Sequence, residues 1–189
     1  MGKIILGSSS PRRADILKKL KLDFEIIPSD YVEPHDRTDF SYDFVENLAY
    51  NKALDVAKKI SEPATVIGAD TIVVTDNKIL GKPKDKQDAY NTLKMLSGKT
   101  HFVVTAIALV QSITLKKKIK SETTYVTFEK LTDSQIEYYI ENFKPFDKAG
   151  SYGIQELPEG YIKYIDGDLD NVIGLPSNLL INMLELEFS

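Results

Sequence analysis

TVIGADTIVV (residues 65–74) is the stretch that decides the fold. Most of its residues are β-branched, and its only charged residue is Asp70. A nearly continuous apolar run of this kind is typical of a strand that is buried on both faces of a sheet. We therefore place a central strand here and assign the rest of the chain outward from it.

The segments on either side alternate between strand and helix patterns. Strands are expected at 3–7, 24–29, 100–111 and 121–130, helices at 11–20, 41–60, 85–96, 136–143 and 179–187, a polar loop at 29–39, a turn at 76–78, the basic run KKKIK (116–120) between two strands, and strand–turn–strand at 161–175. Thr132 and Gln135 form a capping box for the helix that follows them. This alternation predicts an α/β protein with a mixed, curved sheet, in one domain over residues 1–189.

Composition excludes several classes of function. A formal net charge of −4 disfavours binding of a nucleic-acid polymer. The absence of cysteine excludes disulfides, thiol catalysis and cysteine-based zinc sites, and the two histidines, His35 and His101, argue against a histidine-rich metal site. No apolar run approaches the roughly 20 residues of a membrane span, and the start lacks a secretion pattern. A cytoplasmic protein is therefore expected.

Two arginines stand where the start of a helix disfavours them. GSSSPRR (7–13) predicts a turn and then a helix with Ser10 at its N-cap. Arg12 and Arg13 then face the positive end of the helix dipole. Free backbone N–H groups after Ser8 and Ser10 make an anion site there, in which both arginines would bind phosphate. Simple solvation of both side chains is the alternative, because the dipole penalty is only ~0.3–1 kcal/mol.

Lys52 and Asp70 each lie at a position where burial is predicted. Lys52 falls within the apolar stripe of helix 41–60, and Asp70 lies in the middle of the buried strand. A buried charge needs an ionic partner, a ligand or a metal ion. A snorkelling Lys52 and a structural salt bridge at Asp70 stay open as alternatives. Gly68 permits close approach of another backbone or of a ligand. Glu33, in the polar loop, is a candidate second oxygen ligand or an ordinary surface acid.

Three loop and strand-end residues remain open. Lys82 and Lys148 lie in loops beside Pro83 and Gly150, and solvent exposure is the simpler interpretation for either lysine. His101, at the start of a strand, is interpreted as structural.

Together, arginines, lysines and one or two carboxylates suit phosphate transfer or hydrolysis with Mg²⁺. Neither G-x-x-x-x-G-K-[ST] nor G-x-G-x-x-G occurs. The residues alone predict a divalent-metal enzyme or binder for a small phosphorylated ligand.

Several short motifs run in order along nearly the whole chain. They are SSSPRR (8–13), Glu33, NKA (51–53), GADT (68–71), GKP (81–83), LSGKTHFVVTA (96–106), FDKAGSYGIQ (146–155) and NVIGLP (171–176). Each motif is weak alone, but their ordered combination resembles the Maf family of nucleotide pyrophosphatases.

The resemblance implies a fold, a reaction and a set of site residues. The fold is two-lobed and similar to that of inosine triphosphate pyrophosphatases, with the substrate in the cleft between lobes and a homodimer as the common assembly. The reaction is hydrolysis of a nucleoside triphosphate to the monophosphate and pyrophosphate with Mg²⁺ or Mn²⁺. Asp70 matches the catalytic carboxylate and proton acceptor, and Glu33 matches an acid that helps to hold the metal. The phosphate-handling positions are Ser8, Ser10, Arg12, Arg13, Lys52 and Lys82. Arg12, Thr71 and Gln155 match positions tied to base specificity, and Lys148 joins the substrate-binding candidates.

The segment YGIQ after DKAG resembles the branch of the family that prefers dTTP and UTP. The Gln155 amide is able to accept from a pyrimidine N3–H and to donate to its carbonyl oxygen. Many relatives have glycine directly after this glutamine, where this chain has Glu156. Two other functions stay open: a non-catalytic, nucleotide-responsive regulator of septum formation and cell division, and a pyrophosphatase for ITP or XTP.

Overall fold

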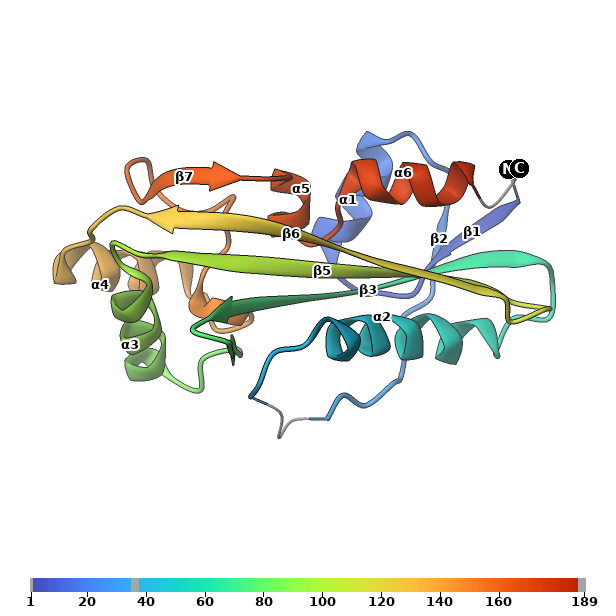
Figure 1. The fold of residues 1–189 in the computed structure, drawn as a ribbon, viewed down its shortest axis with the longest axis horizontal. Helices are drawn as coiled ribbons and strands as arrows, with labels where there is room; N and C mark the ends of the chain where they lie inside the picture. The colour runs from blue at the N-terminus through green and yellow to red at the C-terminus, as the bar shows by residue number, and fades with distance from the viewer. Residues whose placement is uncertain (1, 35–37, 187–189) are drawn as a thin grey trace.

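The computed structural model describes residues 2–34 and 38–186, in which seven strands form one mixed sheet with helices on both faces (Figure 1). The strands are β1 (Lys3–Leu6), β2 (Glu25–Ile26), β3 (Ala64–Thr75), β4 (Lys78–Leu80), β5 (Thr100–Gln111), β6 (Lys117–Phe128) and β7 (Ile162–Asp166). The helices are α1 (Pro11–Lys19), α2 (Tyr42–Ala57), α3 (Lys86–Leu96), α4 (Asp133–Phe143), the 3₁₀ helix η1 (Ala149–Ser151), α5 (Leu169–Ile173) and α6 (Ser177–Glu185).

β3 is the central strand that the sequence predicts. The sheet order is β2-β1-β3-β5-β6-β7, with β4 also beside β3. β1 runs parallel to β3, whereas β4 and β5 run antiparallel to it, so the sheet is mixed. β3, β5 and β6 have 12 residues each and extend along the length of the molecule (Figure 1).

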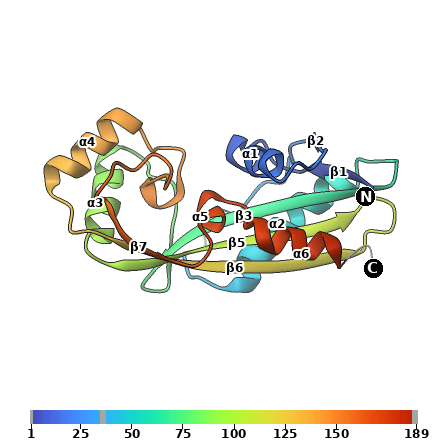
Figure 2. The ribbon, with the colours of Figure 1, turned by 90° about the horizontal axis from the view of Figure 1, so that it is seen from above.

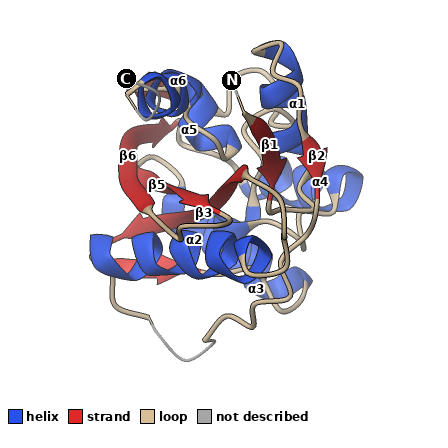
Figure 3. Ribbon diagram, turned by 90° about the vertical axis from the view of Figure 1, so that its right-hand side faces the viewer, coloured by secondary structure: helices blue, strands red, loops and turns tan. Residues whose placement is uncertain are grey.

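The long strands connect two lobes, as predicted. α3 and α4 gather at one end of the sheet, and α1, α2 and α6 gather at the other (Figure 2). In the larger lobe, α2 covers one face of the curved sheet and α1 and α6 cover the other (Figure 3). One apolar core lies on the α2 face, a second on the α1 and α6 face, and a third around α3 and α4.

Residues 161–175 do not form the strand–turn–strand that their apolar pattern predicts. β7 is present, but α5 replaces the second strand. Asp168 is the N-cap of α5 and accepts from Asp170 N, while Gly174, with φ 130°, stands at its C-cap. The segment 169–173 is too short for helical periodicity to appear, so only these two caps signalled the helix.

Two short elements, β4 and η1, were not predicted, and the other differences are shifts of element boundaries. The basic run 116–120 lies mostly within β6, which begins at Lys117, rather than in a connecting turn. β2 has two residues, and α2 ends at Ala57. The capping box of Thr132 and Gln135 is confirmed at the start of α4.

His101 is structural, as the sequence predicts. Its side chain is buried, and its Nε2 is 2.6 Å from the Tyr152 hydroxyl. Burial lowers the pKa of His101 to about 4, so this imidazole is neutral at pH 7. His35, which the composition argument also considered, lies outside the described residues. Among the described residues, no helix has the length and apolar character needed to cross a membrane.

Candidate active site

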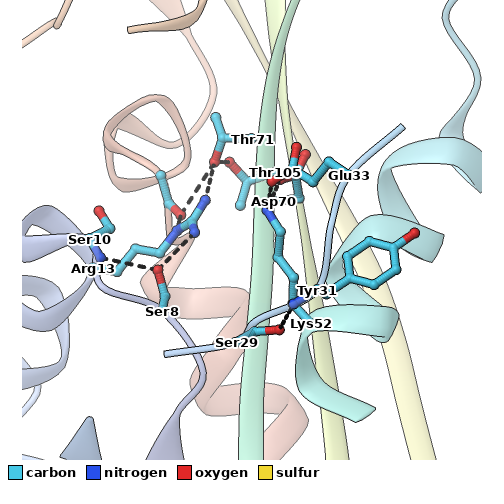
Figure 4. A network of polar contacts seen from close by, with 11 residues as sticks. Ser8, Ser10, Arg13, Ser29, Tyr31, Glu33, Lys52, Asp70, Thr71 and Thr105 are labelled. Carbon is cyan, nitrogen blue, oxygen red and sulfur yellow. Dashed lines mark hydrogen bonds and ion pairs between the residues drawn. The ribbon is translucent and has the colours of Figure 1, made fainter. Parts of the chain in front are cut away.

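A gap in strand pairing leaves the middle of β3 open along one edge. β1 pairs with β3 only as far as Ile67, and β4 pairs with it only from Val73 onward. In the described part of the chain, no strand pairs with β3 between these positions on that edge. Asp70 and Thr71 lie in this gap and, as strand neighbours, point to opposite faces (Figure 4). Groups from both faces of the sheet therefore meet at one edge.

Lys52 lies between two carboxylates at this gap (Figure 4). Its Nζ is 2.5 Å from Asp70 Oδ1 and 2.6 Å from Glu33 Oε1. The side chains of Asp70 and Lys52 are 9% and 15% exposed, whereas that of Glu33 is 43% exposed. Burial raises the pKa of Asp70 above its ordinary value, and the Lys52 ammonium opposes that rise. The salt bridge at Asp70 that the sequence left open is present, and Lys52 is its partner.

Close packing of α2 on β3 brings these two residues together. A Cβ atom at Gly68 would lie 2.3 Å from Ala49 O and 2.7 Å from the Ala53 Cβ. Only glycine therefore allows α2 to lie at this depth on the strand. Lys52 is next to Ala53 in α2, and Asp70 is two residues after Gly68 on the same face of β3. The close approach predicted at Gly68 is thus made by the backbone of α2.

Arg13 joins three segments on the opposite face of β3 (Figure 4). Its Nε donates to Gly174 O at 2.9 Å, its Nη1 to Ser8 Oγ at 3.2 Å and its Nη2 to Thr71 Oγ1 at 3.2 Å. These contacts use three of the five guanidinium N–H groups. Burial lowers the pKa of Arg13, although it stays charged at neutral pH. Arg13 therefore has a structural role that the sequence did not indicate. Its other two guanidinium N–H groups are not used by these three contacts.

The Thr71 hydroxyl is held by residues whose role the sequence also did not indicate. Thr71 Oγ1 is 2.9 Å from Thr105 Oγ1 in β5. Thr105 donates its hydroxyl to Asn171 O and its backbone N–H to Asn171 Oδ1. Asn171 is fully buried on α5, the helix that was predicted as a strand. The one available signal was the asparagine that begins the otherwise apolar motif NVIGLP.

The N-terminus of α1 lies beside this network. Ser10 occupies the predicted N-cap position, but its side chain makes no capping hydrogen bond. The Ser8 hydroxyl instead accepts from Ser10 N at 3.2 Å, as well as from Arg13. The first turn of α1 holds no acid, so the positive end of its dipole is not compensated by the helix itself. Arg12 lies at this end, 37% exposed, with its Nη1 3.9 Å from Asp147 Oδ2.

Lys148 is buried, so the simpler interpretation of an exposed loop lysine is wrong for it. Its side chain is 9% exposed, and its Nζ is 2.9 Å from Asp147 Oδ1 and 3.1 Å from Glu156 Oε2. Glu156 is the residue directly after Gln155, where the family resemblance led us to expect glycine. The local sequence could not show this burial, because it depends on an ion pair formed when the loop folds back on itself.

Lys82 and Gln155 are exposed, and within the described residues neither contacts the Lys52 cluster. Their two loops are nevertheless linked to each other. Gly150 N donates to Gly81 O at 3.1 Å, so the segments that carry Lys82 and Lys148 touch. The structure thus places the predicted residues in three groups. They are the Lys52 cluster (Lys52, Asp70 and Glu33), the Arg13 network (Arg13, Ser8 and Thr71), and the two loops that carry Lys82, Lys148 and Gln155.

Two carboxylates at the gap are available to a divalent cation. Asp70 and Glu33 contact the same ammonium group, so their oxygens lie near each other. The described residues contain no group of three or more histidine, aspartate or glutamate side chains placed to hold a metal. Mg²⁺ is commonly held by only one or two carboxylates, with waters and substrate phosphates as its other ligands. The pair therefore fits such an ion.

Comparison with known proteins decides the family. The description that matches residues 3–187 is "Maf-like protein". The chain belongs to the Maf family. A protein of Ruminiclostridium cellulolyticum named dTTP/UTP pyrophosphatase is 49% identical over 98% of this chain and 96% of its own length. A protein of Acetivibrio thermocellus with the same name is 44% identical over 98% of this chain and 95% of its own. The Maf resemblance expected from the ordered motifs is confirmed.

Two solved structures share the fold of this Maf protein. A HAM1 protein from Coxiella burnetii has a TM-score of 0.53 and 17% identity, and covers 99% of this chain and 100% of its own. The Ham1 protein of Staphylococcus aureus has a TM-score of 0.52 and 16% identity, over 98% and 99% of the two chains. The predicted curved mixed sheet with flanking helices is confirmed.

A cavity of about 360 Å³ lies away from the Maf motifs. It is lined by residues at the start of β3 and at the end of β5, among them Pro63, Thr65, Gln111 and Ile113. None of the predicted site residues lines it.

Proposed function

We propose that this Maf protein is a nucleoside triphosphate pyrophosphatase that hydrolyses dTTP and UTP to the monophosphate and pyrophosphate. The observation that carries the proposal is the Asp70–Lys52–Glu33 cluster at the open edge of β3, in which Asp70 and Lys52 are largely buried, across the strand from Arg13 and the start of α1. Relatives 44–49% identical over nearly the full chain are named for this activity.

The triphosphate would bind at the gap in β3 pairing, between groups that come from the two faces of the sheet. The uncapped start of α1, Arg12 and the two remaining N–H groups of Arg13 supply donors from one face. Lys52 supplies an ammonium from the other face, and the exposed Lys82 is free to turn toward the outer phosphates. Hydrolysis of a phosphoanhydride depends mostly on such positioning and charge stabilisation.

Asp70 is the residue to which we assign proton acceptance. Its carboxylate is the most buried acid of the cluster, and burial raises its pKa, which makes it a stronger base than an exposed aspartate. Lys52 holds the carboxylate in place at 2.5 Å. Mg²⁺ or Mn²⁺ held by Asp70 and Glu33 would supply positive charge against the phosphate oxygens.

Base recognition is assigned to Gln155. Its side chain is exposed on the loop after η1, where its amide is free to pair with a pyrimidine edge. Thr71 is less suited to direct contact with a base, because its hydroxyl is already engaged with Arg13 and Thr105.

A nucleotide panel tests the proposed reaction. Pyrophosphate release is measured from dTTP, UTP, CTP, GTP, 7-methyl-GTP, ITP, XTP and ATP with Mg²⁺ or Mn²⁺, and with EDTA as the control. Release from dTTP and UTP that EDTA abolishes is the expected result. Faster release from ITP or XTP would move the protein to the purine branch, and binding of nucleotide without release would make it a non-catalytic regulator.

The family resemblance is the ground for the assembly, and the sequence analysis is the ground for the location. We propose a homodimer and a cytoplasmic enzyme. Analytical ultracentrifugation at micromolar concentration tests the first, with a single species near twice the 21.3 kDa chain mass expected. A species at the chain mass over the whole concentration range would contradict it.

A further inference from the structure

Glu33 reaches Lys52 from a segment that has no regular structure of its own. After β2, Ile27 N donates to Leu6 O at 3.1 Å, and the next backbone hydrogen bond to the sheet among the described residues is at Thr38, whose O accepts from Ile79 N of β4. The segment 28–34 forms neither helix nor strand, yet it places Glu33 Oε1 2.6 Å from Lys52 Nζ. Some other contact must therefore fix this segment over α2.

Asp55 makes that contact from α2. Its Oδ2 accepts from Ser29 Oγ at 2.9 Å, from Asp30 N at 2.8 Å and from Lys59 Nζ at 2.9 Å. Ser29 Oγ in turn accepts from Tyr31 N at 3.0 Å. Two successive backbone amides of the segment are thus tied to one carboxylate, directly or through Ser29. The Lys59 ammonium holds the pKa of Asp55 below its ordinary value, so the acceptor is ionised at neutral pH.

α2 carries both Lys52, which Glu33 contacts, and Asp55, which binds the 28–34 segment. Asp55 follows Lys52 by three residues and so lies one helical turn away on the same side. Asn51 Nδ2 adds a longer contact of 3.4 Å to the Tyr31 hydroxyl. One rigid helix therefore fixes the lysine and the segment that carries its acidic partner.

We infer that Asp55 is a positioning residue that holds Glu33 against Lys52 and Asp70, a role that rests on the proposed pyrophosphatase function. Asp55 itself contacts neither Lys52 nor Asp70, and its effect on the reaction passes through the 28–34 segment. This distinguishes it from a residue that merely stabilises the fold, because its influence on turnover vanishes once Glu33 is disabled.

The first measurement is independent of activity. Amide hydrogen exchange is followed at Asp30 and Tyr31 in the wild type, in Asp55→Ala and in a matched control, Glu46→Ala. Glu46 is another α2 carboxylate, and within the described residues its side-chain partner is Ser121 of β6 rather than any residue of the segment. Exchange about tenfold faster or more is expected in Asp55→Ala only. Unchanged exchange there would overturn the inference.

The second measurement is a double-mutant cycle on dTTP turnover. Asp55→Ala should lower kcat on the wild-type background and have no further effect on a Glu33→Gln background. Asp55→Asn, which keeps an oxygen acceptor for Ser29 and Asp30, should restore most of kcat. Equal losses from Asp55→Ala on both backgrounds would contradict a role through Glu33. If the wild type releases no pyrophosphate, the proposed function fails, and the exchange measurement alone decides whether Asp55 fixes the segment.

Discussion

Lys52 and Asp70 are charged residues at buried positions, and each indicates on its own that a partner must lie nearby. Each was predicted to be buried at a position that does not suit a charge, and each therefore needed a partner. The structure makes them partners of each other, with Glu33 as the third member. The need for a partner could be predicted from local pattern, but the pairing could not, because 18 residues and a helix–strand contact separate the two groups. Lys148 was misjudged for the same reason: its partner Glu156 comes from the other side of a loop.

Removal of the Lys52 ammonium should shift the acid limb of the pH–rate profile upward. Asp70 accepts a proton only when it is ionised, so turnover falls as the pH drops through its pKa. Burial raises that pKa and Lys52 lowers it, and Lys52→Met keeps the burial while removing the opposing charge. A shift of the limb to higher pH is expected. The residual kcat is measured from pH 4 to 9, beside the control Lys3→Met, because Lys3 is a lysine away from the site that pairs with Glu25 and Glu62. A limb that stays in place or moves down contradicts the assignment of Asp70.

At the scale of elements, the long helices and strands were predicted, whereas short elements such as β4, η1 and α5 were missed. β3, β5, α3 and α4 were found within a few residues, because buried runs, helical periodicity and caps are local signals. α5 was missed because 169–173 is shorter than two helical turns, and this omission also hid the contact of Asn171 with Thr105. Gly68 was interpreted correctly as a point of close approach, although the sequence could not say that α2 would approach it.

Gly68→Ala should destabilise the fold and separate Lys52 from Asp70. The added Cβ would lie 2.3 Å from Ala49 O, which is backbone and has little room to move. Overpacking of this kind costs about 1–3 kcal/mol. Urea denaturation measures the loss, and Gly81→Ala is the matched control, since a Cβ there meets nothing within 4 Å. A Gly68→Ala protein that unfolds at the wild-type midpoint would show that α2 does not rely on this contact.

At the scale of the whole molecule, Arg13 joins parts of the chain that the sequence keeps far apart. It connects the start of α1 to β3 and, 161 residues away, to Gly174 after α5. Strand–helix alternation predicted the α/β class, and the family resemblance supplied the two lobes. The order of strands and the gap in β3 pairing depend on long-range contacts of this kind, which one sequence does not contain as a local signal.

Arg13→Lys should therefore cost more stability than Arg12→Lys. A lysine cannot reproduce the three-way fork to Ser8, Thr71 and Gly174, and a loss of about 1.5–3 kcal/mol is expected. The only partner of Arg12 in the described residues is Asp147 at 3.9 Å. The Arg12→Lys variant should therefore bind nucleotide more weakly, while its free energy of unfolding changes by no more than about 0.5 kcal/mol. Thermal unfolding of both variants checks this. Equal losses of stability would refute the division of roles between the two arginines.

Pyrophosphate release from dTTP by the wild type and by Asp70→Asn tests the central claim most directly. The substitution keeps the shape of the side chain and removes its ability to accept a proton. With saturating Mg²⁺ or Mn²⁺, and with thermal unfolding used to confirm that the variant is folded, turnover should fall by at least about 10²-fold. Near-normal turnover in folded Asp70→Asn would contradict the account, because the Asp70 carboxylate would then not accept a proton in the reaction.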